Sequence, residues 1–261
     1  MMGSSHAVSG AAVWIAVTAT ALPALRLYPL SPTGVLLGAS IAAGAALLAD
    51  ADHHNATIAH SVPILGRAAT GTLERISGGH RHGMHSLLAV AGVIAATIGF
   101  ALIRWTPTGW DRPVQIGSAI AVMACVAFGT KVLNLARSWP SAWFAGALAA
   151  VLVALVAPAE FAWLPICIGV GYVVHLIGDA LTIEGVPLLW PFNPRPPAVI
   201  GKTPILNAMW KDNGYFAVPV LGHAGSWREW LLMLPVAGYV VWGVGATAWG
   251  LALQFIPQPI F

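Results

Sequence analysis

Carboxylates and imidazoles gather at Asp50-Ala51-Asp52-His53-His54, directly after an apolar run from Gly34 to Ala49. Carboxylate oxygens and imidazole nitrogens are the ligands that Zn²⁺, Mn²⁺ and Fe²⁺ take in proteins. Only 8% of the residues are charged, so two acids and two histidines at one point need a reason. A polar helix end at a membrane surface would also explain this stretch. We interpret Asp50, Asp52 and His53 as candidate metal ligands, and His54 as a weaker one.

A second pair, His175 and Asp179, stands near the end of another apolar run. Residues four apart share one face of a helix, so both side chains can reach one ion or bridge two. The alternative is a polar pair that joins helices. Ionisable groups inside a membrane are costly and are functional by default, which favours the ligand interpretation.

Three more histidines, His80, His82 and His85, precede a third apolar run that Ser86 could cap. They cannot all lie on one helical face, so a turn must present some of them. Arg81 could bind a phosphate with its two-pronged guanidinium, or it could be an ordinary headgroup-facing arginine. We expect His80 and His85 to be ligands and His82 to be a neighbour.

Composition indicates a helical membrane protein. The chain is 58% hydrophobic with a mean hydropathy of +0.78, whereas soluble domains are about 45–50% apolar. Its apolar runs are continuous and about 17–25 residues long, as spanning helices require, and do not alternate as barrel strands do. We predict an all-α polytopic bundle, a single domain over residues 1–261, with about seven spans at 7–25, 33–49, 86–104, 114–134, 141–157, 163–182 and 229–253. Cys125 and Cys167 fall inside these runs and are expected to be small core residues.

Threading the chain through these spans places all nine histidines on one side of the membrane. The same side receives 9 of the 12 Lys and Arg residues and the other side 3, which marks it as cytoplasmic. The N-terminus and the site are therefore expected inside and the C-terminus outside. His6 opens the first span, which has no basic segment before it and is expected to be a retained helix. The Pro-rich segment 183–228 is predicted to lie on the membrane surface and to cover the site. His60 and His223 have no partner at helical spacing and are left out.

The predicted ligand set exceeds the needs of one catalytic zinc ion, which takes three protein ligands. Two or three Zn²⁺ ions, or Mn²⁺ or Fe²⁺ in their place, would use it, with Asp50 or Asp52 as a bridge. Paired metals stabilise phosphoryl displacement and activate water as the nucleophile. No zinc-protease, hydrolase-elbow or Walker motif is present. The predicted ligands are His6, Asp50, Asp52, His53, His80, His85, His175 and Asp179, and the predicted catalytic residues are Asp52, Arg81 and Asp179.

The order of these motifs resembles the YdjM-type family of inner-membrane, metal-dependent hydrolases. The resemblance covers roughly residues 5–195 and rests on His6, Leu48 to His53, Gly79 to Arg81 with His85-Ser86, Gly171-Tyr172, His175 to Asp179 with Thr182, and Gly185 to Pro191. The all-helical His/Asp site is also distantly similar to zinc-dependent phospholipase C and P1-type nucleases. That likeness implies phosphoester hydrolysis.

We therefore expect a bacterial inner-membrane hydrolase that acts on a lipid or a small amphiphilic phosphoester. Its partners would be membrane lipid and that substrate; nucleic acid is not expected, because no basic cluster with interleaved aromatics stands in a soluble segment. Two other functions remain open. A metal transporter would carry ionisable residues near the span midpoints, and a scaffold would hold the polar cluster without metal.

Overall fold

The computed structural model describes residues 1–20, 23–201 and 203–254, and within them the chain forms helices and loops without a β-strand. The long helices are α1 (Gly3–Thr18), α2 (Pro32–Ala45), α4 (Leu87–Ala101), α5 (Ile116–Val132), α6 (Trp139–Val156), α7 (Leu164–Ala180) and α10 (Trp227–Leu253). A shorter amphipathic helix, α3 (Leu65–Ser77), lies between α2 and α4 in the chain. The predicted all-α class is confirmed.

Each predicted span overlaps one of the long helices. Four stretches are long and apolar enough to cross a membrane: Pro32–Asp52, Trp139–Val156, Pro158–Ala180 and Trp227–Leu253. Helices α4 and α5 are apolar but shorter, so the count of seven crossings stays a prediction. The first helix ends at Thr18 rather than near residue 25, because the backbone becomes extended at Ala19.

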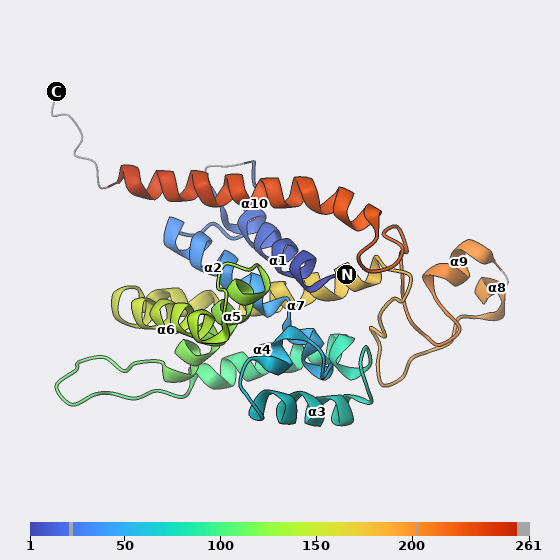
Figure 1. Ribbon diagram of the computed structural model, residues 1–261, viewed down its shortest axis with the longest axis horizontal. Coiled ribbons are helices and arrows are strands. Elements are labelled where there is room, and N and C mark those ends of the chain that lie inside the picture. The colour runs from blue at the N-terminus through green and yellow to red at the C-terminus, as the bar shows by residue number, and fades with distance from the viewer. Residues whose placement is uncertain (21–22, 202, 255–261) are drawn as a thin grey trace.

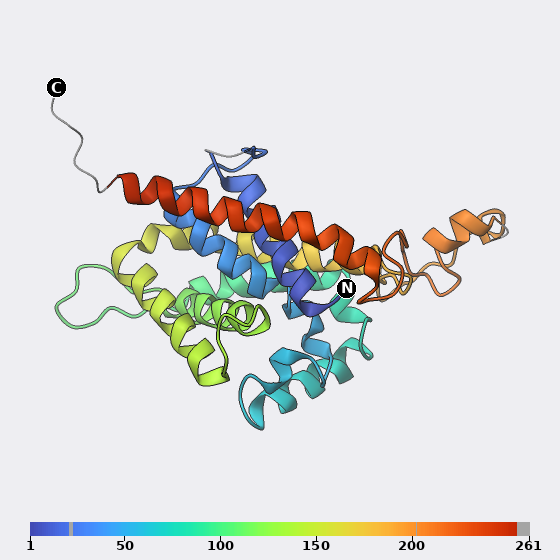
Figure 2. The ribbon, with the colours of Figure 1, turned by 45° about the horizontal axis from the view of Figure 1, so that its top comes forward.

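Helix α2 is the centre of the bundle. It packs against α1, α5, α7 and α10, while α4 packs against α7 and α6 against α5. Figures 1 and 2 both show α10 lying across α1 and α2. Helices α2 and α7 approach closely at Gly171, where a Cβ atom would lie 2.5 Å from the carbonyl oxygen of Ala42. Small residues at such contacts are typical of helices packed in a membrane, and Cys125 and Cys167 are buried in this core.

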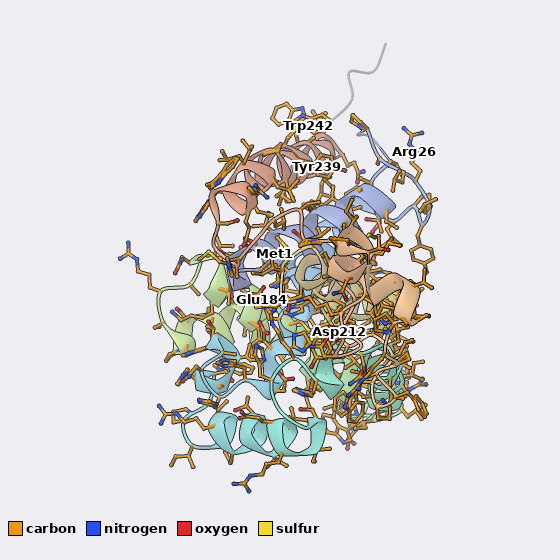
Figure 3. All side chains as sticks on the ribbon, turned by 90° about the vertical axis from the view of Figure 1, so that its right-hand side faces the viewer. Met1, Arg26, Glu184, Asp212, Tyr239 and Trp242 are labelled. Atoms are coloured by element: carbon orange, nitrogen blue, oxygen red, sulfur yellow. The ribbon has the colours of Figure 1, made fainter. Side chains whose placement is uncertain are left out.

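Alternation of helix direction brings several helix ends to one end of the bundle. Helices α1, α4 and α10 begin there, whereas α7 and the 3₁₀ turn Leu48–Asp52 that follows α2 end there. Ser86 caps α4, since its hydroxyl accepts a hydrogen bond from the Ala89 N–H at 3.2 Å. Figure 3 looks onto this end, with Met1 and Glu184 near the middle of the view.

Segment 183–228 consists of two limbs, residues 183–197 and 210–228, joined by a tip, residues 198–209. The limbs pair with each other at Val186 and Phe216 and with the end of α7, where the Leu221 N–H donates to the Leu181 carbonyl at 3.0 Å. The tip carries two short helices, α8 (Ala198–Gly201) and α9 (Pro204–Met209), which project from the bundle in Figure 1. The limbs contact Arg81 through Glu184 and Tyr215. The membrane-surface location of the segment and its role as a cover stay predictions.

Candidate metal centre

Two buried imidazoles and two carboxylates converge from three helix ends. His175 and Asp179 share a face of α7, Asp50 lies in the turn after α2, and His85 lies in the 3₁₀ turn Gly83–His85 before α4. The Nε2 atoms of His85 and His175 are 3.2 Å apart. They lie 3.8 and 3.7 Å from Asp50 Oδ1, and 3.4 and 3.5 Å from Asp179 Oδ2. Neighbouring ligands of a tetrahedral zinc ion are separated by roughly 3.4 Å, as bond lengths near 2.1 Å dictate.

Contacts on the far side of each ring leave both Nε2 atoms facing the centre. His175 Nδ1 donates to the carbonyl oxygen of Ala46 at 2.6 Å, so the Nε2 lone pair of a neutral His175 is bare. His85 Nδ1 faces Asp52 Oδ2 at 3.6 Å, and neither of these buried atoms has a hydrogen-bond partner. Two bare lone pairs at 3.2 Å repel each other unless a proton or a cation lies between them.

The electrostatics around His85 indicate the same need for positive charge. Burial alone lowers the pKa of His85, but the carboxylates of Asp179 and Asp52 outweigh burial and raise the pKa from 6.5 to about 9. Without a metal, His85 therefore holds a proton at neutral pH. A divalent cation would satisfy the same requirement.

His6 completes a second group of three possible ligands with His175 and Asp179. Its Nε2 lies 3.2 Å from Asp179 Oδ1, and its ring stacks on His175 with centroids 3.7 Å apart. Gly178 makes this approach possible, because a Cβ atom there would lie 3.0 Å from the His6 ring. Asp179 thus presents one oxygen to His6 and the other to His85 and His175, which is the arrangement of a bridging carboxylate. The amino group of Met1 also lies 2.5 Å from Asp179 Oδ1.

Asp52, His80 and His53 form an outer layer. Asp52 is fully buried behind His85, and its Oδ1 lies 3.0 Å from His80 Nδ1. The His53 ring meets His80 edge-on at 4.3 Å. The structure brings these three predicted ligands next to the centre but outside both groups of three ligands that it could form.

The weaker histidine candidates make polar contacts elsewhere. His54 pairs with Glu74 at 3.3 Å, and His82 Nδ1 lies 3.0 Å from the His80 carbonyl oxygen. His223 pairs with Glu184 at 3.4 Å. His60 is exposed in the turn Thr57–His60.

Arg81 reaches the centre from a turn with an unusual backbone. Its φ of 59° is left-handed, and its carbonyl oxygen accepts a hydrogen bond from the Tyr215 hydroxyl at 3.0 Å. The guanidinium lies between Asp179 and Glu184. Sequence reasoning missed both Glu184 and Tyr215. Sequence reasoning could have found Glu184, because it follows Asp179 by only five residues. Nothing in the sequence connects Tyr215 to Arg81.

The sequence model of the YdjM inner membrane protein family matches residues 1–133 and 138–250. This chain belongs to the YdjM inner membrane protein family. No curated protein and no solved structure matches it. The family match confirms the resemblance noted in the sequence, and its description as an inner membrane protein agrees with the predicted membrane. The number of crossings and the orientation stay predictions for this YdjM-family protein.

The candidate centre of this YdjM-family protein is accessible at Asp50. The Asp50 side chain lines a cavity of about 170 Å³ together with Gly3, Asn55, Thr57 and Val132. A water molecule occupies about 30 Å³ of liquid, so the cavity can hold several waters or a small polar group.

Proposed function

We propose that this protein is a membrane-embedded, metal-dependent hydrolase that cleaves a phosphoester of a lipid or another amphiphile. The observation that carries the proposal is the pair of buried Nε2 atoms, 3.2 Å apart, with carboxylate oxygens of Asp50 and Asp179 within 3.8 Å of each. Buried imidazole and carboxylate ligands at such separations fit a divalent cation.

The residues fit two ions with Asp179 shared between them. Asp50, His85 and His175 would hold the first, since three protein ligands and an open position characterise catalytic zinc. His6 and the second oxygen of Asp179 would hold the other. Mixed nitrogen and oxygen donors suit Zn²⁺ best, with Mn²⁺ or Fe²⁺ as substitutes.

A bound divalent cation polarises a phosphoryl oxygen and brings the pKa of a bound water towards about 7. The chain's own groups position that chemistry. The Ala46 carbonyl oxygen accepts a hydrogen bond from His175 and fixes its ring, and the Asp52 carboxylate faces His85 Nδ1 at 3.6 Å, from where it would orient that ring around a bound ion. Arg81, next to Asp179, offers a guanidinium that would neutralise the charge of a phosphoryl group.

The setting of the centre favours an amphiphilic substrate. The centre lies at one end of a bundle whose core is apolar, and the cavity of about 170 Å³ at Asp50 can admit a polar group. An apolar tail would stay outside, in the lipid. We therefore propose that the substrate reaches the centre from the bilayer.

The distribution of buried charge argues against a transporter. Among the described residues, the fully buried carboxylates are Asp52, Asp179 and Glu229, and Glu229 accepts a hydrogen bond from the Met2 N–H at the same end of the bundle. A transport path needs such groups near the midplane as well. A scaffold would keep the cluster without an ion, so metal content distinguishes it from a hydrolase.

Elemental analysis and turnover of the purified full-length protein test the proposal. We expect bound metal, and hydrolysis of a generic phosphodiester or a lipid phosphate, from the wild type and from the His60→Ala control. His175→Ala and Asp50→Ala should lose both. Wild-type protein without metal, or full metal content in both site variants, would contradict the assignment.

A further inference from the structure

Arg81 holds a position between two carboxylates without bonding closely to either. Nη2 lies 3.4 Å from Asp179 Oδ1, and Nη1 lies 3.6 Å from Glu184 Oε2. Good N–H···O bonds measure 2.7–3.2 Å, and the buried Nη1 has no hydrogen-bond partner. A guanidinium carries five donors in a rigid fork. Arg81 therefore neutralises the two carboxylates while most of its donors remain unused.

The carboxylate oxygen that Arg81 approaches is also a candidate metal ligand. Asp179 Oδ1 faces His6 Nε2 at 3.2 Å from the other side. A guanidinium and a divalent cation on the same oxygen would repel each other, because both carry positive charge. The cationic side chain and the cation therefore compete for Asp179.

We propose that Arg81 is a displaceable counter-ion, an inference that rests on the proposed function. In the metal-free protein, Arg81 neutralises Asp179 together with the Met1 amino group, which lies 2.5 Å from the same Oδ1 atom. When the ligand group is filled, the Arg81 side chain leaves Asp179 and turns its fork to the phosphoryl group of the substrate. Metal and anion binding are then linked through one side chain.

The turn that carries Arg81 is built for such a movement. The Tyr215 hydroxyl holds its carbonyl oxygen, and Gly78 and Gly79, on the other side of His80, also have positive φ. The backbone is thus fixed from segment 183–228 while the side chain, 19% exposed, keeps freedom at the mouth of the site. Glu184, 40% exposed, lies 3.6 Å from Nη1 and competes with an anion for that nitrogen.

Linkage makes the proposal measurable. If Arg81 passes from Asp179 to the anion, metal must tighten anion binding, and the anion must tighten metal binding by the same factor. Two measurements on the detergent-solubilised full-length protein test this linkage. Competition with a chelator gives the affinity for Zn²⁺, and calorimetry gives the affinity for inorganic phosphate with and without Zn²⁺.

Arg81→Gln removes the charge and should move the two affinities in opposite directions. We expect Zn²⁺ to bind about tenfold more tightly, since a repelling charge is lost, and phosphate to bind at least about tenfold more weakly. Arg81→Lys keeps the charge but loses the fork, so Zn²⁺ affinity should stay near wild type while phosphate weakens. Arg75→Gln, at an exposed arginine of α3, controls for net charge and should leave both affinities unchanged.

Glu184→Gln gives a second test. The Glu184 side chain is 40% exposed, so its substitution should disturb the fold little. Removal of the competing carboxylate should tighten phosphate binding several-fold and leave Zn²⁺ affinity unchanged. Weaker phosphate binding in this variant, or weaker Zn²⁺ binding in folded Arg81→Gln, would overturn the proposal. If the wild type bound no Zn²⁺, the proposed function would fall and this inference with it. If the wild type bound Zn²⁺ and Arg81→Gln matched it in both affinities, this inference would be wrong while the proposed function would stand.

Discussion

The residues that follow α2 supply both a candidate metal ligand and groups that lie behind the other candidate ligands. Asp50 faces the two Nε2 atoms, the Ala46 carbonyl accepts from His175 Nδ1, and Asp52 lies behind His85. Acceptors behind a metal-binding histidine fix its ring and its tautomer, and their loss typically costs 10–100-fold in metal affinity. Seven consecutive residues, 46–52, thus control three of the ligands.

Asp52→Asn should weaken metal binding by about 10–100-fold without abolishing it, because the ring of His85 loses its orienting carboxylate while its Nε2 remains. Chelator competition measures the change. Asp50→Asn, which alters a direct ligand, should cost more. If Asp52→Asn bound metal as tightly as the wild type, the orienting role of Asp52 would be wrong.

The raised pKa of His85, about 9, makes metal affinity depend on pH. A metal binds neutral imidazole, so below pH 9 binding must release the proton that His85 holds in the metal-free protein. Affinity should rise by up to about tenfold per unit between pH 7 and pH 9, and then level. Titrations in buffers of different ionisation enthalpy would detect the released proton. An affinity that did not change over this range would contradict the raised pKa.

At the scale of elements, close contacts between helices position the ligands. Helix α7 carries His175 and Asp179, and its contact with α2 at Gly171 brings them to the turn that holds Asp50. A methyl group at Gly171 would meet the Ala42 carbonyl oxygen, part of the α2 backbone, which cannot move aside. The geometry of the centre therefore depends on a backbone contact about one turn from His175 and about two turns from Asp179.

Gly171→Ala should destabilise the protein by about 1–3 kcal/mol, since overpacked cores lose roughly this much. It should also lower metal content. Thermal unfolding in detergent measures the first effect and elemental analysis the second. Gly245→Ala on α10 is the matched control: no atom lies within 4 Å of its added Cβ, so the variant should equal or exceed wild type in stability. If the two variants had the same stability and metal content, the α2–α7 contact would have room for a methyl group and this prediction would be wrong.

The sequence predicted the elements better than their ends. Continuous apolar runs predict the helices and their order. The four-residue spacing of His175 and Asp179 predicts that they share one face of a helix. The early end of α1 and the helices of the tip depend on local backbone geometry that apolar patterns do not encode. At the site, the sequence could group Asp52 and His80 with the ligands, but only three-dimensional packing places them behind His85. The pairing of Arg81 with Glu184 and Tyr215 likewise depends on how segment 183–228 folds back.

At the scale of the whole molecule, the buried carboxylate and imidazole side chains of the described residues are gathered at one end of the bundle. Predicted ligands from α1, α2, α4 and α7 meet there, whereas Glu160, in the turn Pro158–Trp163, bonds to Ser31 and Trp163 instead. The bias of basic residues predicts that the end with the centre is cytoplasmic.

Labelling with a membrane-impermeant maleimide tests that orientation. Cys125 and Cys167 are buried and should not react, so single cysteines can be introduced at exposed loop positions. Asn55→Cys, beside the centre, should react only from the cytoplasmic side, and Trp110→Cys, in the loop between α4 and α5, only from the opposite side. Reaction of both from the same side would contradict the predicted orientation and span count.

The ligands are contributed by helices spread from residue 6 to residue 179. During synthesis, a chain that has not yet inserted α7 lacks both His175 and Asp179, and so it lacks a member of each ligand group. Under the proposed function, a nascent or truncated chain without α7 would therefore have neither complete ligand group, and it would have no activity towards the lipids around it.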